Sequence, residues 1–252
     1  MRNTKSKVVV VTGGSRGIGA AISKLTAHKG YRVCVNYKNN ESIANDVVKE
    51  ILNSGGSAIA VQADISNEKE VVRLFEVVDS ELGQITALVN NAGIITPQSK
   101  LVDMDASRLQ KIFNTNVVGS FLCAREAIKR MSYIHKGNGG SITNLSSAAA
   151  RIGSPNEFID YAASKGAIDT MTLGLSKEVA EDGIRVNAVR PGLIDTELHS
   201  DSGDANRPVK LKQFVPMKRV GTAEEVANTV LWLMSEKASY VTGALIDVTG
   251  GR

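Results

Sequence analysis

Tyr161 and Lys165, four residues apart, are the pair in this sequence best suited to moving a proton. On an α-helix this spacing puts both side chains on one face, close enough to interact. A neighbouring ammonium favours the phenolate form and lowers the pKa of a phenol, which suits it to donate and accept protons near neutral pH. Such pairs also occur by chance on helix surfaces, so the prediction needs a second motif.

The second motif is a glycine-rich turn that follows an apolar run over residues 7–12. The run predicts a buried strand, and the residues after the turn have helical periodicity up to 29. Gly13, Gly17 and Gly19 are spaced G-x-x-x-G-x-G, a variant of the usual G-x-G-x-x-G. Glycines allow close approach of the backbone, and a helix N-terminus favours an anion, so this unit predicts a phosphate cradle. The alternative is a plain strand-to-helix turn.

Composition limits the classes of protein to consider. The 252 residues suit one domain, 1–252, with 42% apolar and 22% charged residues. A net charge of +4 is too small and dispersed to predict nucleic-acid binding, and no apolar run has transmembrane length. The two cysteines fall in apolar segments, which favours core positions and a reducing, cytoplasmic setting. The three histidines are scattered, so we expect no metal site.

Strand and helix patterns alternate along the whole chain. Strands are predicted near 7–12, 32–36, 57–62, 86–90, 140–146, 184–190 and 243–248. Helices are predicted near 17–29, 40–54, 67–82, 107–132, 157–181 and 222–235. This alternation predicts an α/β fold: a doubly wound parallel sheet between two layers of helices, in a single domain.

Polar or glycine-rich clusters follow several of the predicted strands. Besides the glycine turn they are 90–93, 146–147 and 191–192. Ligands of doubly wound sheets bind at the carboxyl ends of the strands, so these clusters are expected to meet along one rim. The longest irregular stretch, 193–215, follows the sixth strand and is either a substrate lid over that rim or a surface excursion.

These motifs, in this order and spacing, closely resemble those of the short-chain dehydrogenase/reductase family over residues 6–251. The residues that carry the resemblance are Thr12 to Gly19, Asp64, Asn90 to Gly93, Asn116, Ser147, Tyr161 to Lys165, and Pro191-Gly192. The resemblance implies a Rossmann-type fold, a nicotinamide cofactor, and hydride transfer between that cofactor and a carbonyl or alcohol carbon. It also implies a homotetramer packed through the helices near 107–132 and 157–181 and the C-terminal segment.

The resemblance assigns catalytic roles to four residues. Tyr161 matches the acid/base, and Lys165 the residue that holds the nicotinamide ribose and lowers the tyrosine pKa. Ser147, rather than its neighbour Ser146, matches the hydroxyl that polarises the substrate oxygen, and Asn116 the residue that positions a water for proton relay. Asn116 can equally be a hydrogen-bonded buried amide, and Ser147 an ordinary strand-end hydroxyl.

Binding residues follow from the same resemblance. The cofactor-binding set is Gly13, Ser15, Arg16, Gly17, Ile18, Gly19, Asn36, Tyr37, Asp64, Ile65, Asn91, Ala92, Gly93, Tyr161, Lys165, Pro191, Gly192, Ile194 and Thr196. In the family the residue at Asp64 contacts the adenine, although Asp64 can also be a helix N-cap. The substrate-binding set is Ser147, Ala149, Tyr161 and Leu193, with Ile94, Ile95, Arg151, Phe158 and Leu198 as further walls. Arg151 is either an anchor for an acidic group or a solvated charge.

The end of the second strand predicts which nicotinamide cofactor binds. Sites that prefer NAD place Asp or Glu there to accept from the ribose hydroxyls, whereas this strand ends in Asn36-Tyr37-Lys38. Arg16, inside the glycine turn, offers a guanidinium fork suited to a phosphate. We therefore predict NADP(H), the alternative being that Arg16 faces solvent and both cofactors bind.

The sequence favours a cytoplasmic NADP(H)-dependent carbonyl reductase or alcohol dehydrogenase that acts on a small molecule. A 3-oxoacyl-carrier-protein reductase and a sugar dehydrogenase are alternatives with the same motifs. The former needs a basic docking patch, for which Lys129, Arg130 and Lys136 are candidates. A remote alternative is a non-catalytic NADP(H) sensor or scaffold, which typically lacks the tyrosine or lysine present here.

Overall fold

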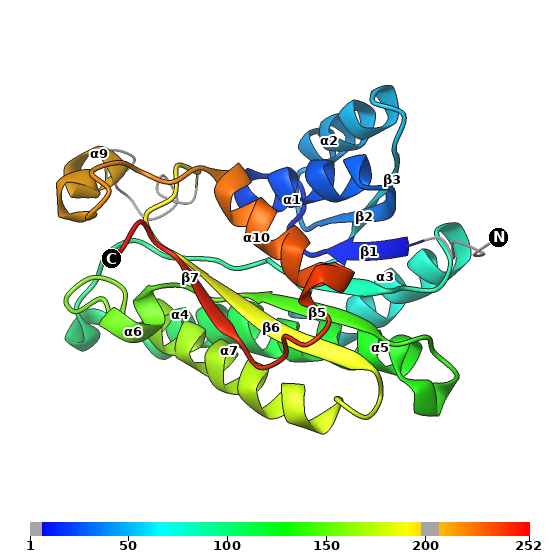
Figure 1. Cartoon of the computed structure of the whole chain (residues 1–252). Coiled ribbons are helices and arrows are strands. Elements are labelled where there is room, and N and C mark those ends of the chain that lie inside the picture. Colours follow the sequence, from blue (N-terminus) through cyan, green and yellow to red (C-terminus); the bar gives the residue numbers. More distant parts are fainter. Residues whose placement is uncertain (1–6, 198–206) are drawn as a thin grey trace.

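The computed structural model describes residues 7–197 and 207–252, which form one seven-stranded sheet with helices on both faces (Figure 1). The strands are β1 (Lys7–Val11), β2 (Tyr31–Tyr37), β3 (Ser57–Gln62), β4 (Ala87–Asn90), β5 (Gly140–Leu145), β6 (Ile184–Pro191) and β7 (Leu245–Val248). Their order in the sheet is β3-β2-β1-β4-β5-β6-β7, and every pair is parallel. The predicted doubly wound Rossmann-type fold is confirmed. The strand order reverses between β1 and β4, which is where such sheets bind ligands.

Two layers of helices cover the sheet. One layer contains α1 (Gly17–His28), α2 (Glu41–Asn53) and α10 (Ala223–Met234). The other contains α3 (Glu68–Glu81), α4 (Ala106–Phe113), α5 (Gly119–Met131) and α7 (Ile159–Glu178). Two short helices, α6 (Ala149–Ile152) and α9 (Arg207–Leu211), lie beyond the carboxyl ends of the strands. Within the described ranges, no helix combines the length and apolar character needed to span a membrane.

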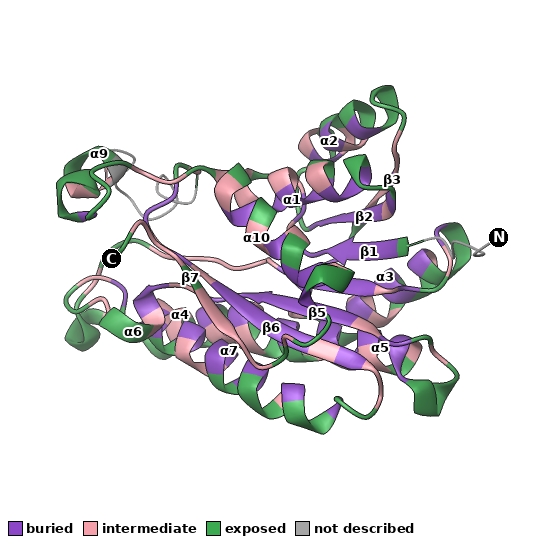
Figure 2. Cartoon of the chain, viewed as in Figure 1, coloured by how far each residue is buried: buried purple, intermediate pink, exposed green. Residues whose placement is uncertain are grey.

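The strands are apolar on both faces because each face is covered by helices. Valines fill β1, and the five inner strands are mostly buried between the two layers, whereas the edge strands β3 and β7 are only partly buried (Figure 2). The layer of α3, α5 and α7 packs on a core that includes both cysteines, Cys34 from β2 and Cys123 from α5, and neither forms a disulfide. The layer of α1, α2 and α10 packs on a second core that includes Ile22, Val33 and Val230.

The structure differs from the predicted elements at three places. The helix expected over 107–132 is divided into α4, one π-helical turn (Asn114–Val118) and α5. A π-helical turn inserts one residue into a helix. Because the apolar periodicity on either side of it is almost unchanged, the sequence pattern does not reveal the turn. The described parts of the stretch 193–215, residues 193–197 and 207–215, contain α9 and a 3₁₀ turn (Lys212–Phe214), and α6 was not expected.

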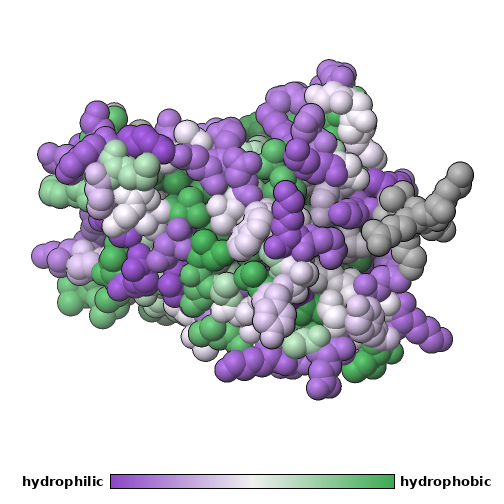
Figure 3. All heavy atoms as spheres, in the orientation of Figure 1, coloured by the Kyte–Doolittle hydropathy of each residue, from purple (hydrophilic) through white to green (hydrophobic). Residues whose placement is uncertain are grey.

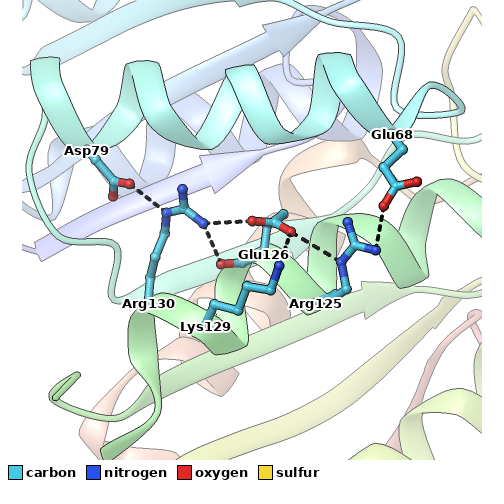
Figure 4. A network of polar contacts seen from close by, with 6 residues as sticks. All are labelled: Glu68, Asp79, Arg125, Glu126, Lys129 and Arg130. Carbon is cyan, nitrogen blue, oxygen red and sulfur yellow. Dashed lines mark hydrogen bonds and ion pairs between the residues drawn. The ribbon is translucent and has the colours of Figure 1, made fainter. Parts of the chain in front are cut away.

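An ion-pair network joins α3 to α5 on the face away from α10 (Figure 4). Its centre is the buried carboxylate of Glu126, which accepts from Arg125 (3.2 Å), Lys129 (2.9 Å) and Arg130 (3.0 Å). Glu68 and Asp79 of α3 complete it, bonded to Arg125 at 2.7 Å and to Arg130 at 2.6 Å respectively. The network therefore fixes two neighbouring helices of one layer.

Candidate active site

The glycine turn brings backbone N–H groups to the carboxyl edge of the sheet. Gly13 and Gly17 have positive φ (60° and 48°), a conformation that other residues adopt only with strain. A Cβ on Gly13 would lie 3.0 Å from the Cα of Ala92, and a Cβ on Gly19 would collide with the Gly13 carbonyl. The turn thus needs glycine for its conformation and for close packing, and it presents the N-terminus of α1 to the space above β1.

Side chains from the ends of three strands hold this turn in place. The Thr12 hydroxyl accepts from the N–H groups of Asn91 and Ala92 (3.0 Å each), and the Asn91 amide donates to the carbonyls of Thr12 (2.9 Å) and Gly13 (3.0 Å). The buried Asn36 side chain accepts from Gly13 N–H at 3.2 Å. It also donates to backbone carbonyls of residues 61 and 63. The Asn36 amide is therefore bonded to backbone on both its oxygen and its nitrogen.

A cavity of about 530 Å³ opens along this edge. All nineteen residues predicted to bind the cofactor line it, from Gly13 just after β1 to Thr196 beyond β6. The glycines leave no side chain that would fill the cradle, and the wall continues past the end of β2 through Lys38, Asn39 and Asn40. The cavity therefore fits an elongated ligand whose phosphate lies at the N-terminus of α1.

A second, smaller cavity of about 110 Å³ adjoins the first. The two cavities share the wall residues Ser147, Tyr161, Pro191 and Gly192. Ala149 and Leu193 line the smaller cavity, as do Ile95 and Phe158, so the predicted substrate-binding residues surround one space. Ile94 lines the larger cavity, Arg151 lines neither, and Leu198 lies outside the described residues.

Tyr161 stands where the two cavities meet, on the first turns of α7. Its phenol is hydrogen-bonded to the Ser147 hydroxyl, which also accepts from the N–H of Ala149 at 3.1 Å. Ser146 instead donates its hydroxyl to the Lys165 carbonyl at 3.1 Å, so the two neighbouring serines have different hydrogen-bond partners. Only Ser147 presents its hydroxyl to the phenol.

The prediction of a lowered tyrosine pKa is wrong for this structure. Burial raises the pKa of Tyr161 above its ordinary value of 10.0, and the hydrogen bond with Ser147 opposes this only in part. The Lys165 ammonium lies 5.6 Å from the centre of the tyrosine ring and donates to the Leu145 carbonyl at 2.7 Å, away from the phenol oxygen. The phenol is therefore protonated at neutral pH.

Lys165 is itself an unusual group, because its ammonium is buried with little compensation. The residue is 4% exposed, and the only hydrogen bond that its ammonium makes among the described residues is the one to the Leu145 carbonyl. Burial lowers the pKa of Lys165 to about 8, and the charge of Asp169 offsets part of that effect. Asp169 is bonded to Arg190 at 2.7 Å, which limits its support of the lysine.

Asn116 lies in the π-helical turn and is 1% exposed. Its side-chain oxygen accepts from Ile94 N–H (2.8 Å), while its nitrogen donates to the Ile94 carbonyl (3.0 Å) and to the Ser164 hydroxyl (3.1 Å). It lines neither cavity. This is the geometry of a hydrogen-bonded buried amide that ties the loop after β4 to α7, while its role in proton relay stays a prediction.

At the other end of the larger cavity, Asp64 pairs with Lys38 at 2.6 Å. Its carboxylate also accepts from the N–H (3.0 Å) and hydroxyl (2.7 Å) of Ser66. Burial opposes ionisation, but Lys38 and Ser66 outweigh it and hold the pKa of Asp64 below its ordinary value. Asn67, not Asp64, caps α3.

Several residues that line the cavities were missed. Lys38, Asn39 and Asn40 directly follow the predicted second strand, so their position was a usable signal. Arg207, Leu211 and Arg252 line the smaller cavity but lie far along the chain from every motif. No local pattern could have placed them there.

Comparisons with known proteins agree with this geometry. A family model described as enoyl-(acyl carrier protein) reductase matches residues 13–252. An uncharacterised oxidoreductase of Escherichia coli (strain K12), YgfF, is 53% identical over 97% of this chain and 99% of its own length. The chain is 37% identical to glucose 1-dehydrogenase 2 of Bacillus subtilis (strain 168), over 99% of this chain and 96% of that protein.

A reductase and a solved structure are also similar to this chain. A 3-oxoacyl-[acyl-carrier-protein] reductase, FabG, from Staphylococcus aureus (strain Mu50 / ATCC 700699) is 38% identical over 100% of this chain and 99% of its own. Among solved structures, a double mutant of a Serratia marcescens short-chain dehydrogenase/reductase superposes with a TM-score of 0.89 at 33% identity, covering 97% of both chains.

Proposed function

The chain belongs to the short-chain dehydrogenase/reductase family, an oxidoreductase family, and we propose that it is an NADP(H)-dependent enzyme that interconverts a carbonyl compound and a secondary or primary alcohol. The observation that carries the proposal is the wall common to the two cavities. There the hydrogen-bonded hydroxyls of Ser147 and Tyr161 face a cofactor-sized space on one side and a substrate-sized space on the other.

The protein's own groups act on the oxygen of the substrate. The nicotinamide, when bound, supplies a hydride to the carbonyl carbon or accepts one from the alcohol carbon. In reduction, Tyr161 gives its proton to the carbonyl oxygen as the C–O π bond opens, so that hydride and proton together make the alcohol. Ser147 donates to the same oxygen and stabilises its developing negative charge. The Lys165 ammonium beside the ring then stabilises the phenolate until it is reprotonated.

The raised pKa of Tyr161 favours reduction near neutral pH. A general acid must start protonated, and burial keeps the phenol in that form. Oxidation of an alcohol needs the phenolate as base and so gains from alkaline conditions. We expect the reduction rate to fall as pH rises into the range where Tyr161 ionises, and the oxidation rate to rise there. Initial rates in both directions across pH measure this.

NADP(H) is proposed over NAD(H) from the charges at the far end of the larger cavity. Arg16 and Lys38 line that end, and β2 ends without an acidic residue. A 2′-phosphate would gain from Arg16, and from Lys38 where it draws that ammonium from its single ion pair with Asp64, whereas an acid at the strand end would repel it. Asn36 is a poor site for switching cofactor, because its amide is bonded to backbone on both sides.

The cofactor test therefore uses the two cations. We expect Arg16→Ser and Lys38→Ala each to weaken NADPH binding about tenfold, as loss of a charge-assisted contact would, and to change NADH binding little. Lys24→Ala, on the exposed face of α1, serves as a control. Dissociation constants from nucleotide fluorescence give the readout. An equal loss for NADPH and NADH would overturn the assignment.

The two alternative enzymes differ in the size of their substrates. A 3-oxoacyl-carrier-protein reductase must bind a carrier protein, whereas a sugar dehydrogenase binds only a small molecule. Two residues of the basic patch considered for a carrier protein, Lys129 and Arg130, lie in the network around Glu126. The Arg130 carbonyl accepts from Gln84, which precedes β4, so this patch lies toward the amino ends of the strands. The cavities are at the carboxyl ends, which favours a small substrate that enters without a docked carrier.

We also propose that the predicted stretch 193–215, of which residues 198–206 lie outside the described residues, is a substrate lid. Arg207 and Leu211 of α9 form part of the smaller cavity, and Arg207 is held by two hydrogen bonds to Glu157 (2.7 and 2.6 Å). Glu157→Gln would weaken this attachment and is expected to raise the KM of the substrate more than it lowers kcat. An unchanged KM would contradict the lid.

We also propose that the protein is a homotetramer and that it is located in the cytoplasm. Val118, Phe121 and Leu173 expose apolar surface on α5 and α7 and the turn between α4 and α5. β7 is an edge strand, and Figure 3 shows apolar surface along it. Light scattering on purified protein measures the mass, and fractionation of cells measures the location. The two free cysteines suit a reducing compartment.

The first experiment follows NADPH consumption against ketones, aldehydes, sugars and acyl thioesters. Tyr161→Phe is expected to lower kcat by about 10²-fold to 10⁴-fold while NADPH still binds. Activity that survives this change would show that Tyr161 is not the acid. NADPH binding without turnover of any compound, in wild type, would instead favour a sensor or scaffold.

A further inference from the structure

The smaller cavity holds a charge that neither the fold nor the proposed chemistry uses. One end of it carries the hydroxyls of Ser147 and Tyr161, and its sides are mostly apolar, with Ile95, Phe158 and Leu193 among them. Two arginines also line it, Arg207 and Arg252. A neutral carbonyl compound would need neither cation.

Arg207 has a structural partner for its charge. Its two terminal nitrogens bond both oxygens of the Glu157 carboxylate, and its guanidinium carbon lies 5.1 Å from the centre of the Phe158 ring. A guanidinium held by a two-point bond to a carboxylate has little charge left for a ligand. Arg207 therefore closes the wall of the cavity.

The other arginines of this edge are paired as well. Arg190 bonds Asp169 at 2.7 Å, and Arg151 lies 3.3 Å from Asp247. Arg151 also donates to the backbone oxygen of Arg252 at 3.0 Å, which holds that residue beside the cavity. The sequence left Arg151 as either an anchor for an acidic group or a solvated charge; its partner is Asp247, and it lines neither cavity.

Arg252 is different. Its guanidinium has no carboxylate partner among residues 7–197 and 207–252, although the residue is partly buried and borders the smaller cavity. It does not line the larger cavity, so it is not placed to hold the cofactor's phosphates. A cation that is partly removed from water and unpaired is expected to bind an anion strongly.

We propose that Arg252 binds a carboxylate of the substrate, and that the substrate is therefore a small aldehyde or keto acid. Its carbonyl would lie at Ser147 and Tyr161 and its apolar chain against Ile95 and Leu193. The inference rests on the proposed function for the position of the carbonyl, but the anion site stands on the geometry of Arg252 alone. The modest volume of the cavity, about 110 Å³, selects a short chain between the two groups.

The test compares acids with their neutral esters. Pyruvate, acetoacetate and levulinate are each measured against the methyl ester with NADPH in excess. For the best-fitting length, kcat/KM for the acid is expected to exceed that for the ester at least tenfold, the usual effect of one charge-assisted contact. Arg252→Gln should bring this ratio close to one, mainly by raising KM for the acid. Arg252→Lys, which keeps the charge but not the fork, should give an intermediate ratio.

A matched arginine and a binding measurement separate this inference from the proposed function. Arg219→Gln removes an exposed guanidinium that pairs with Glu225, and it should leave the acid-to-ester ratio unchanged. Calorimetry with the same three acids and NADP⁺-saturated protein needs no turnover. Binding lost in Arg252→Gln supports the anion site even if no compound is reduced. Ester reduction without preference for the acid, or no binding of the acids to wild type, would overturn the inference, and the former would leave the proposed function intact.

Discussion

Two buried charges, Glu126 on α5 and Lys165 on α7, are treated in opposite ways by this molecule. Glu126 accepts hydrogen bonds from Arg125, Lys129 and Arg130. Burial opposes its ionisation, but these three cations outweigh burial and hold the pKa of Glu126 below its ordinary value. Lys165 has one carbonyl and a distant, shared carboxylate, and burial lowers its pKa to about 8.

The difference separates a structural charge from one available for chemistry. A fully paired ion such as Glu126 joins helices and has no capacity left for a ligand. An under-compensated ion such as Lys165 is unfavourable for the empty protein and is stabilised when an anionic or hydroxylated group arrives. Perturbed pKa values gather at functional sites for this reason. The four predictions that follow each test one side of this comparison.

The largest effect is expected on activity from Lys165→Met. Loss of the ammonium removes the charge that stabilises the phenolate of Tyr161, so kcat for carbonyl reduction should fall about 10²-fold to 10³-fold. Steady-state kinetics at saturating NADPH measure the effect, and Lys49→Met, on the exposed surface of α2, is the control. A fall of less than threefold would place Lys165 among the structural charges.

Next in size is the loss of stability expected from Glu126→Gln. Removal of the carboxylate leaves three cations facing each other and should lower the free energy of unfolding by about 3 kcal/mol. The folded pKa of Glu126 is depressed, so its contribution is present above its ordinary pKa of 4.5 and is lost as pH falls through the folded value. Urea unfolding at pH 7 and pH 4 measures both. Equal differences at the two pH values would contradict the electrostatic explanation.

The third effect has the opposite sign. The charged form of Lys165 is disfavoured in the folded state, so Lys165→Met should stabilise the fold by about 2 kcal/mol at pH 7, after allowance for the lost bond to Leu145. Between pH 8 and 10.5 the unfolded chain binds this proton and the folded one does not, so wild type regains stability there. Thermal unfolding of both proteins across that range gives the comparison. A mutant less stable than wild type at pH 7 would refute it.

The smallest effect is expected at the edge of the network. The side chain of Arg125 is 41% exposed, and its partner Glu68 is 61% exposed. Solvent screens such pairs, so Arg125→Gln should change the free energy of unfolding by about 0.5 kcal/mol. Arg125→Gln, at the exposed edge of the network, and Glu126→Gln, at its buried centre, are compared in one assay, which shows whether burial sets the strength of these ion pairs. A loss of stability in Arg125→Gln as large as that in Glu126→Gln would mean that burial does not set the strength of these ion pairs.

The sequence predicted what is local and missed what depends on distant packing. The glycine turn was visible because strand, glycines and helix are contiguous, and the carboxyl edge because parallel strands must end together. The π-helical turn at Asn116 was not visible, since the apolar pattern continues on both sides of it. Arg207 and Arg252 reach the smaller cavity only through the path of the folded chain. The pKa of Tyr161 was misjudged because spacing shows that Lys165 is near but not that its ammonium is turned toward Leu145.

The two cysteines, Cys34 and Cys123, can report how often the folded core opens. Both thiols are fully buried in the core between the sheet and α5, and burial raises the thiol pKa, for Cys123 to about 12. Neither thiol can react with an alkylating reagent until that core separates. The modification rate at each cysteine then reports how often its surroundings detach. Faster labelling of Cys123 than of Cys34 would show that the helix leaves before the sheet comes apart, with no probe introduced.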